Sequence, residues 1–231
     1  MCTIIALRGV HPGYPLVVAA NREEFTSRRA TGPVVLSESP RVAGGLDRQG
    51  RGTWLGVTGR GFFVGITNQR TWGMPDSTRR SRGVLVLDAL RLGSVDAVES
   101  YLKALAPRAF NPFNLLFGDA ASLAVAYVRD EAPEVTVERL PAGMHVLTND
   151  RMGSPWFPKE ALPSTRLKLD AVPSMDLGPP RGVRSTTRCV TSPTSRGRGS
   201  PGGLCPDAAS TSAARSAPGT RPAPAGDERL R

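Results

Sequence analysis

The chain has 231 residues, with 30 Lys and Arg against 20 Asp and Glu and a formal net charge of +10. This length suits one sizeable domain or two small ones, and no stretch approaches the roughly 18 apolar residues of a membrane-spanning helix. The charge is uneven, because residues 1–177 carry a net +4 and residues 178–231 a net +6. The basic excess therefore marks a compositional boundary and does not indicate a specific nucleic-acid-binding domain.

The C-terminal segment differs in composition from the rest of the chain. It is rich in Arg, Pro, Gly, Ser and Ala and has no aromatic residue, so it cannot bury enough apolar surface to offset its ordering entropy. We expect residues 1–188 to form the folded domain and residues 189–231 a disordered basic tail. A role of this tail in binding RNA or a membrane surface is disfavoured, because its Arg residues are dispersed and lack aromatic stacking partners.

The numbers of cysteine and histidine residues indicate in which cellular compartment the protein works and whether it can bind a metal ion. Three cysteines, Cys2, Cys189 and Cys205, are an odd number, which argues against a disulfide framework or a four-ligand zinc site. The apolar run at 16–20 is too short for a secretory signal. We expect a reduced, cytoplasmic protein without a metal, because His11 and His145, the two histidines, lie outside any metal-binding spacing.

Paired strands open the chain. Residues 2–7 and 16–20 are apolar and flank a Pro- and Gly-rich turn, which predicts an antiparallel pair. Residues 53–58 and 62–67 flank Gly59-Arg60-Gly61 and predict a second hairpin.

Two helices and further strands follow. Ser81 is an expected cap of a helix that ends at Gly93, and Ser94 is an expected cap of the next helix. Short apolar runs at 114–117, 123–129, 135–140 and 145–148 predict four more strands. This order predicts an α+β domain of antiparallel sheets layered with helices.

Cys2 is the first candidate for chemistry. Removal of Met1 ahead of a small residue would put a thiol and a free α-amine on one residue, and these groups titrate near pH 8.5 and 7.7–8.0 respectively in model peptides. One residue could then supply both nucleophile and base. The alternative is that Cys2 is a small hydrophobe in a buried strand.

Polar residues that end strands are the other candidates. Arg22 and Glu23 follow the strand expected to pair with that of Cys2, where they could favour the thiolate and orient the amine. Asn68 and Asn149 each follow a Thr at the end of an apolar run. Their side-chain amides could stabilise an oxyanion, although polar residues at these places are also typical of turns.

These residues belong to a set of motifs that resembles a known family. The motifs occur in the family's order between residue 1 and about residue 188: M-C-T at 1–3, A-A-N-R-E-E at 19–24, R-G-T-W-L-G-V at 51–57, T-N-Q-R at 67–70, S-R-G at 81–83 and L-T-N-D to P-W-F-P-K at 147–159. The set is similar to the NRDE family, also called the transport-and-Golgi-organisation protein two family.

The resemblance implies a fold, an activity and site residues. The implied fold is the four-layer α-β-β-α sandwich of N-terminal-nucleophile hydrolases, distantly similar to choloylglycine hydrolases and penicillin V acylases. The implied activity is hydrolysis of a C–N amide bond in an unknown small molecule, with Cys2 as nucleophile, Arg22 and Glu23 as its supports, and Asn68 and Asn149 as donors. No cofactor is implied for this activity.

A binding role is the alternative that the same resemblance leaves open. Eukaryotic members of the family are associated with Golgi organisation, secretion and haem handling, so the fold could serve in trafficking without catalysis. Haem would then be the ligand, and Cys2, His11 and His145 the available axial ligands.

Two departures from the family pattern stand out. The motif has Asp where this chain has Glu23, which lengthens the side chain by one methylene. After G-V-R-S-T-T at 182–187, family members continue with an apolar strand, whereas this chain continues with R-C-V-T-S-P-T-S-R. We hypothesise that a shifted reading frame produced residues 189–231 and that the last strands of the domain are missing.

Overall fold

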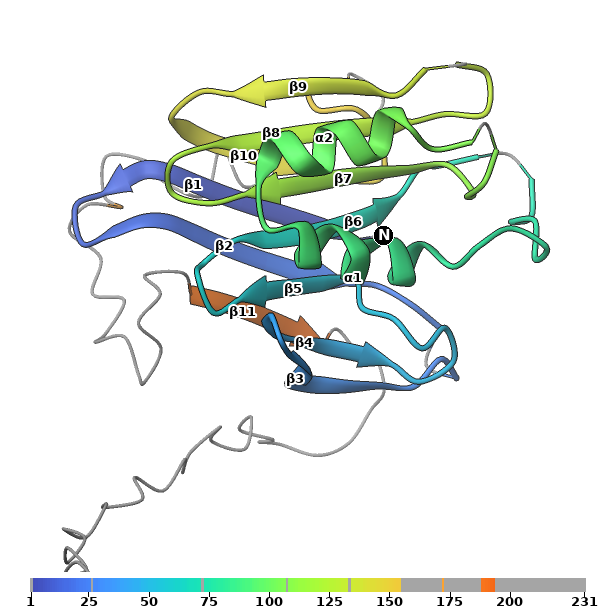
Figure 1. Cartoon of the computed structure of the whole chain (residues 1–231), viewed down its shortest axis with the longest axis horizontal. Helices are drawn as coiled ribbons and strands as arrows, with labels where there is room; N and C mark the ends of the chain where they lie inside the picture. The colour runs from blue at the N-terminus through green and yellow to red at the C-terminus, as the bar shows by residue number, and fades with distance from the viewer. Residues whose placement is uncertain are drawn as a thin grey trace, which may run out of the picture. The chain divides into compact units, whose positions relative to one another are not determined.

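The structure, a computed structural model, describes residues 2–25, 27–71, 73–106, 108–132, 134–154 and 172, and the backbone of 188–193. Two helices and eleven strands lie in this part of the chain (Figure 1). Their order is β1 (Thr3–His11), β2 (Tyr14–Arg22), β3 (Ala30–Glu38), β4 (Arg41–Asp47), β5 (Leu55–Thr58), β6 (Phe63–Asn68), α1 (Arg82–Leu92), α2 (Val95–Lys103), β7 (Phe113–Gly118), β8 (Leu123–Val128), β9 (Thr136–Leu140), β10 (Gly143–Leu147) and β11 (Arg188–Pro193).

The strands form two sheets. One has four strands in the order β10-β1-β2-β11, and the other has seven in the order β3-β4-β5-β6-β7-β8-β9. Neighbouring strands are antiparallel except β2 and β11, which are parallel. The N-terminal strand β1 is internal to its sheet, so its first residues lie between the ends of two neighbouring strands.

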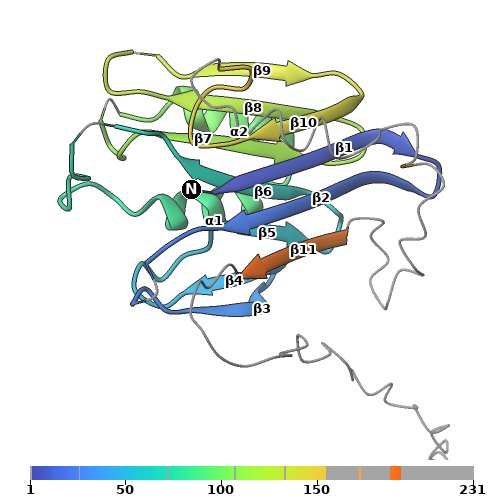
Figure 2. The ribbon, with the colours of Figure 1, turned by 180° about the vertical axis from the view of Figure 1, so that it is seen from behind.

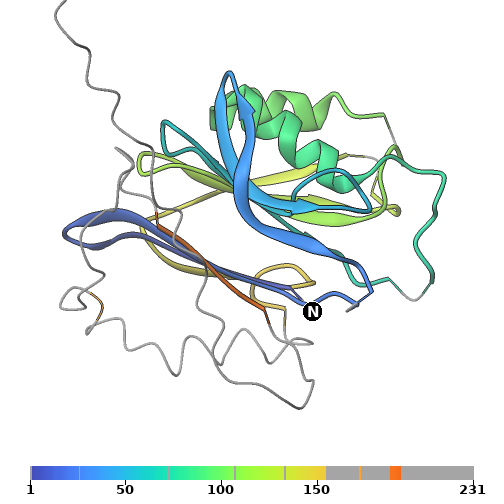
Figure 3. The same cartoon turned by 90° about the horizontal axis from the view of Figure 1, so that it is seen from below.

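The sheets stack face to face, and both helices cover the outer face of the seven-stranded sheet (Figure 3). One apolar cluster joins the helices to that sheet, for example through Leu85, Leu90 and Phe117. A second cluster lies between the sheets and includes Ile4, Leu16 and Leu116. Burial of apolar surface on both faces of the larger sheet supplies the main driving force for this arrangement.

The expected α+β class with antiparallel sheets is confirmed, and three of the four expected layers lie within the described residues. Both expected hairpins form, as β1–β2 and β5–β6. Gly93 ends α1 in the left-handed region with φ of 66°, and Ser94 caps α2 by accepting the N–H of Ala97. Ser81 differs from expectation: it precedes α1, but its hydroxyl contacts the carbonyl oxygen of Gly50 and forms no cap.

The β3–β4 hairpin was not expected from the sequence. Its Gly, Pro and Ser residues resemble a loop, and two irregularities of register interrupt its pairing. The apolar side chains of Val34 and Val35 are also exposed, so β3 lacks the alternation that identifies a half-buried strand.

Strand β11 crosses the boundary that the sequence predicts after residue 188. Its backbone pairs with β2 from Val17 to Arg22. The predicted boundary stays a prediction, and the expected disorder of 194–231 lies outside the described residues. No helix in the described part of the chain is long and apolar enough to cross a membrane.

Candidate functional site

Three strand termini meet at one end of the four-stranded sheet. Strand β1 begins where β2 and β10 end, beside the marked N-terminus (Figure 2). The last backbone pairs at this end of β1 are Thr3 with Asn21 of β2 and Ile4 with Leu147 of β10. When the same registers are extended to residue 2, Cys2 lies opposite Arg22 on one side and opposite Asn149 on the other. The topology therefore gathers three of the sequence-predicted site residues.

Cys2 is a half-buried free cysteine at this junction. Its thiol donates to the backbone carbonyl oxygen of Glu23 at an Sγ–O distance of 3.9 Å, and the Glu23 carboxylate accepts from the side-chain amide of Asn21 at 3.4 Å. Burial raises the pKa of the Cys2 thiol; the charge of Glu24 raises it further, and that of Arg22 lowers it. Nucleophilic attack from this thiol therefore needs a base or a nearby positive charge.

Arg22 lies between the thiol and a network of charges. Its Nη2 is 3.9 Å from a carboxylate oxygen of Glu24 and 4.0 Å from one of Asp47. The guanidinium carbon is 4.8 Å from the ring centroid of Trp54. Nη2 is buried, and although it lies at ion-pair distance from these two carboxylates it makes no hydrogen bond within the described residues.

Asp47 anchors this network at the end of β4. Its carboxylate accepts from Arg28 Nε at 2.9 Å and from the backbone N–H groups of Gln49 and Gly50 at 3.0 and 3.2 Å. Burial by itself would raise the pKa of Asp47, but these hydrogen bonds outweigh it and the pKa is lowered. Asp47 is therefore a carboxylate at neutral pH and holds Arg28 in place.

The two candidate asparagines lie together on the opposite side of Cys2. The Asn149 side-chain amide donates to the carbonyl oxygen of Asn68 at 2.7 Å, and the carbonyl oxygen of Asn149 accepts from the N–H of Arg70 at 2.9 Å. Asn149 is buried and Asn68 is exposed. These bonds join the end of β10 to the end of β6, and thus one sheet to the other.

A buried polar network behind the asparagines was not recognised in the sequence. Asn114 Nδ2 donates to Thr67 Oγ1 at 3.1 Å and to the carbonyl oxygens of Thr148 and Asp150 at 3.2 Å each. The hydroxyl of Thr67 also donates to the carbonyl oxygen of Thr148. The repeated T-N dipeptide at 67–68 and 148–149 is the sequence feature that indicates the two threonines of this network. No comparable feature indicates Asn114, because it lies inside an apolar strand.

Arg82 is a second residue that sequence reasoning did not select. It begins α1 and donates to the carbonyl oxygen of Pro112 at 3.0 Å. Burial and the charge of Arg28 lower its pKa, whereas Glu24 and Cys2 raise it. Arg82 and the Cys2 thiol therefore interact electrostatically. The position of Arg82 in the S-R-G motif is the sequence feature that could have marked it as a site residue.

The candidate haem ligands do not converge. Cys2 precedes β1 and His11 ends it, so they are roughly 30 Å apart at about 3.3 Å per residue. His145 pairs with Ala6 in the middle of β1, and its Nε2 lies 2.9 Å from the carbonyl oxygen of Pro141. Within the described ranges, no group of three or more His, Cys, Asp or Glu could hold a metal ion.

Comparison with known proteins identifies the family. Residues 1–168 match the family model described as Transport and Golgi organisation 2. The chain belongs to the Transport and Golgi organisation 2 family. A bovine (Bos taurus) relative, "Transport and Golgi organization protein 2 homolog", is 32% identical over 151 residues, covering 62% of this chain and 53% of that protein. The chain thus spans about half the length of the curated relatives it matches, and the resemblance found in the sequence is confirmed.

Solved structures of hydrolases also resemble this member of the family. The C2A mutant of conjugated bile acid hydrolase from Clostridium perfringens is 16% identical, with a TM-score of 0.45, over 73% of this chain and 58% of that one. The Caenorhabditis elegans orthologue of N-acylethanolamine-hydrolyzing acid amidase is 14% identical, with a TM-score of 0.47, over 72% and 75% of the two chains.

Proposed function

We propose that this chain is an N-terminal-cysteine hydrolase of a C–N amide bond in a small molecule. The observation that carries the proposal is the register of β1, which sets Cys2 between Arg22 and Asn149. A thiol, a positive charge and a side-chain amide are the groups that acyl transfer needs in one place. Glu23 supports Cys2 through its backbone carbonyl oxygen.

The mechanism begins with removal of Met1. The α-amine of Cys2 takes the thiol proton, and the sulfur attacks the amide carbonyl carbon. Asn149 donates to the resulting oxyanion while Asn68 holds the Asn149 amide through its carbonyl oxygen. The α-ammonium then protonates the leaving amine as the C–N bond breaks. Water hydrolyses the thioester, again with the α-amine accepting a proton, which restores the thiol.

Arg22 acts in this scheme through its charge, which lowers the pKa of the Cys2 thiol against the effect of burial. Arg82 adds positive charge at longer range. These charges favour the thiolate without a metal or a cofactor in the scheme.

The test is a turnover assay with acetyl, octanoyl and palmitoyl amides of aminomethylcoumarin. The processed protein should release fluorophore, and rapid quenching should trap an acyl group on Cys2 by mass spectrometry. Cys2→Ala should abolish both signals, whereas Cys189→Ser should leave them unchanged. Fluorophore release that persists in Cys2→Ala would contradict the proposal.

A non-catalytic role in trafficking or binding is the second candidate function. Burial of Cys2, which raises the pKa of the thiol, is the observation that favours it, because a protonated thiol is a poor nucleophile. The separation of Cys2, His11 and His145 opposes paired axial ligation of one haem within a chain. A haem titration followed by absorbance tests this role, and a saturable Soret shift that Cys2→Ala abolishes would support it.

A further inference from the structure

The backbone of Arg82, at the start of α1, lies against the segment that follows Asp47. The carbonyl oxygen of Gly83 accepts the N–H of Thr53 at 3.2 Å. A Cβ on Gly52 would lie 2.3 Å from the carbonyl carbon of Gly83, so position 52 needs glycine for this close approach. The contact fixes the first turn of α1 beside the charge network of the candidate site.

The guanidinium of Arg82 reaches toward the two candidate asparagines. Its Nη1 donates to the carbonyl oxygen of Pro112 at 3.0 Å, and the same oxygen accepts the N–H of Gln69 at 3.1 Å. Gln69 follows Asn68, whose carbonyl oxygen binds the side-chain amide of Asn149. The charged end of Arg82 therefore lies near the proposed oxyanion residues.

Arg82 differs from the other two arginines of this site in its lack of a carboxylate partner. Glu24 and Asp47 both make ion pairs with Arg22 and Arg28, at N–O distances from 2.7 to 4.0 Å. Arg82 makes no ion pair within the part of the chain that the structure describes, and its side-chain hydrogen bond there goes to a neutral carbonyl group. Its positive charge is therefore available to an anion from outside the protein.

The remaining N–H groups of Arg82 are accessible. A guanidinium has five N–H donors, and the bond to Pro112 uses Nη1. Nη2 of Arg22 is fully buried without a hydrogen bond, but no nitrogen of Arg82 shares that condition. The side chain of Arg82 is half-buried, and burial lowers its pKa, whereas the charge of Cys2 raises it. A partly desolvated cation gains from binding an anion.

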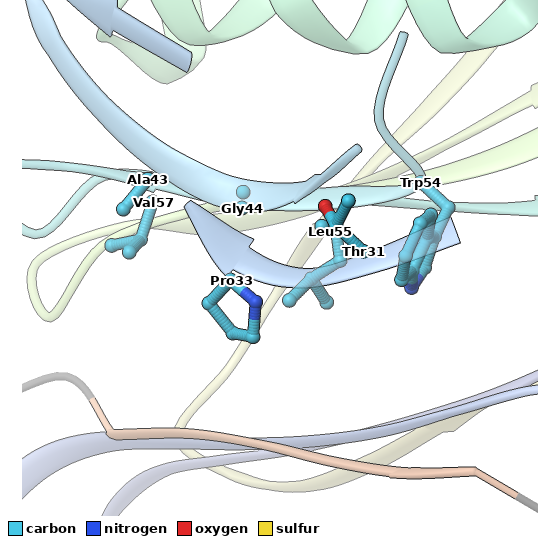
Figure 4. A pocket seen from close by; sticks show the side chains of 9 residues that line it. Thr31, Pro33, Ala43, Gly44, Trp54, Leu55 and Val57 are labelled. Atoms are coloured by element: carbon cyan, nitrogen blue, oxygen red, sulfur yellow. The ribbon is translucent and has the colours of Figure 1, made fainter. Parts of the chain in front are cut away.

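The apolar pocket next to this site provides no counter-charge for an anion. Its walls come from β3, β4, β5 and Trp54, and the side chains that line it, such as Pro33, Ala43 and Val57, are all uncharged (Figure 4). A carboxylate in that pocket would lose hydration without gaining an ionic partner. Arg82 is therefore the better position for the charged part of a ligand.

We propose that Arg82 binds a carboxylate of the amide substrate through the N–H groups that its bond to Pro112 leaves free. The planar guanidinium matches the two oxygens of a carboxylate. The substrate is then an amide that carries a carboxylate in its acyl or its amine portion. That the anion belongs to a substrate rests on the proposed hydrolase function, whereas anion binding by Arg82 does not.

Two matched pairs of amides test the proposal and locate the carboxylate. The acyl-side pair is the glutaryl amide of aminomethylcoumarin and its methyl ester. The amine-side pair is N-octanoylglycine and N-octanoylglycinamide, with release of glycine or glycinamide followed by mass spectrometry. In one pair, kcat/KM should be about 10- to 100-fold higher for the carboxylate, the range expected of a hydrogen bond to a charged group.

Arg82→Gln should remove this preference. Loss of its charge also disfavours the thiolate, but that effect is equal for both members of a pair, so their ratio reports on the carboxylate alone. Arg82→Lys keeps the charge without the planar donors and should retain part of the preference. Arg80→Gln is the matched control and should leave the ratio unchanged, because Arg80 is exposed and its Nη2 lies 3.8 Å from a carboxylate oxygen of Asp88.

Equilibrium binding separates the anion site from the hydrolase. Titration calorimetry with Cys2→Ala should show the same preference for the carboxylate in Kd, and the Cys2→Ala, Arg82→Gln double variant should show none. This binding preference without turnover by the unmodified protein would refute the hydrolase and leave the anion site standing.

The anion site is wrong if neither carboxylate binds more tightly than its neutral partner. It is equally wrong if the preference survives Arg82→Gln, or if Arg80→Gln removes it to the same extent. Turnover of both members of each pair at equal rates would support the hydrolase and refute the assignment of Arg82.

Discussion

The side-chain amide of Asn149 donates to the backbone carbonyl oxygen of Asn68 at 2.7 Å. This bond joins the end of β10 in one sheet to the end of β6 in the other, beside the first residue of β1. It holds the buried side chain of Asn149, a residue that the register places opposite Cys2. The geometry of the proposed oxyanion site therefore depends on a contact between the two sheets.

Replacement of Asn149 should affect both activity and stability. Asn149→Ala removes the buried donor, and we expect the free energy of unfolding to fall by about 1 kcal/mol. Loss of an oxyanion donor should lower turnover of the coumarin amides about 100- to 1,000-fold. Urea unfolding and kcat measurement check the two effects.

Asn68→Ala is the matched control for this variant. It keeps the backbone carbonyl oxygen that Asn149 binds, so the free energy of unfolding should change by less than about 0.5 kcal/mol, as at other exposed positions. Full turnover by Asn149→Ala would show that its amide does not stabilise the oxyanion.

The network around Asn114 should contribute strongly to stability. Asn114→Leu removes three hydrogen bonds from a fully buried amide, and we expect a loss of about 2–3 kcal/mol in the free energy of unfolding. Asn111→Ala removes an amide that bonds to the exposed backbone of Asp76 and should cost about 1 kcal/mol or less. If both variants lose the same free energy of unfolding, the buried network contributes no more to stability than the exposed hydrogen bonds of Asn111.

Asp47 should make stability depend on pH in the acid range. Its pKa is lowered in the folded state, so the unfolded chain takes up a proton first as the pH falls. The contribution of Asp47 is complete above the unfolded carboxyl pKa of about 3.9, and it is lost as the pH falls through the lower folded value. Asp47→Asn should flatten the curve of unfolding free energy against pH below about pH 4.

The same flattening should follow from Arg28→Ala, because Arg28 provides hydrogen bonds that lower the pKa of Asp47. Chemical denaturation over a series of pH values measures it. Curves that run parallel for the unmodified protein and both variants would contradict the assignment.

The charges around Cys2 should change its reactivity in opposite directions. Arg22 lowers the pKa of the thiol and Glu24 raises it. The pH midpoint of alkylation by iodoacetamide should therefore rise in Arg22→Ala and fall in Glu24→Gln. The measurement uses a Cys189→Ser, Cys205→Ser background so that only Cys2 reacts. Shifts of the same sign in both variants would rule out this electrostatic account.

Much of this site could be predicted because its residues follow recognisable strands. The apolar runs before Arg22, Asn68 and Asn149 predicted that each residue ends a strand, and the first hairpin placed Arg22 near Cys2. Asn114 could not be found in this way, because F-N-L-L-F has the composition of a buried strand. Its hydrogen bonds reach Thr67 in β6 and the carbonyl oxygens of Thr148 and Asp150, which follow β10. Such contacts between distant parts of the chain are not visible in the local sequence pattern.

The β3–β4 hairpin was missed for a related reason. Gly44 and Gly45 break the alternation expected of a strand, yet a Cβ on Gly44 would lie 2.5 Å from the carbonyl oxygen of Leu55. Glycine is therefore needed where β4 packs closely on its neighbour. The position of Asp47 at the end of β4 depends on this hairpin, and it was not predicted.

The most direct test of the central claim is the identity and reactivity of the mature N-terminal residue. The measurement is intact-mass and N-terminal peptide analysis of the purified protein, followed by timed iodoacetamide alkylation at neutral pH. The account predicts that Met1 is absent and that Cys2 reacts faster than Cys189 and Cys205. Retained Met1, or a Cys2 thiol no more reactive than the other two, would contradict it.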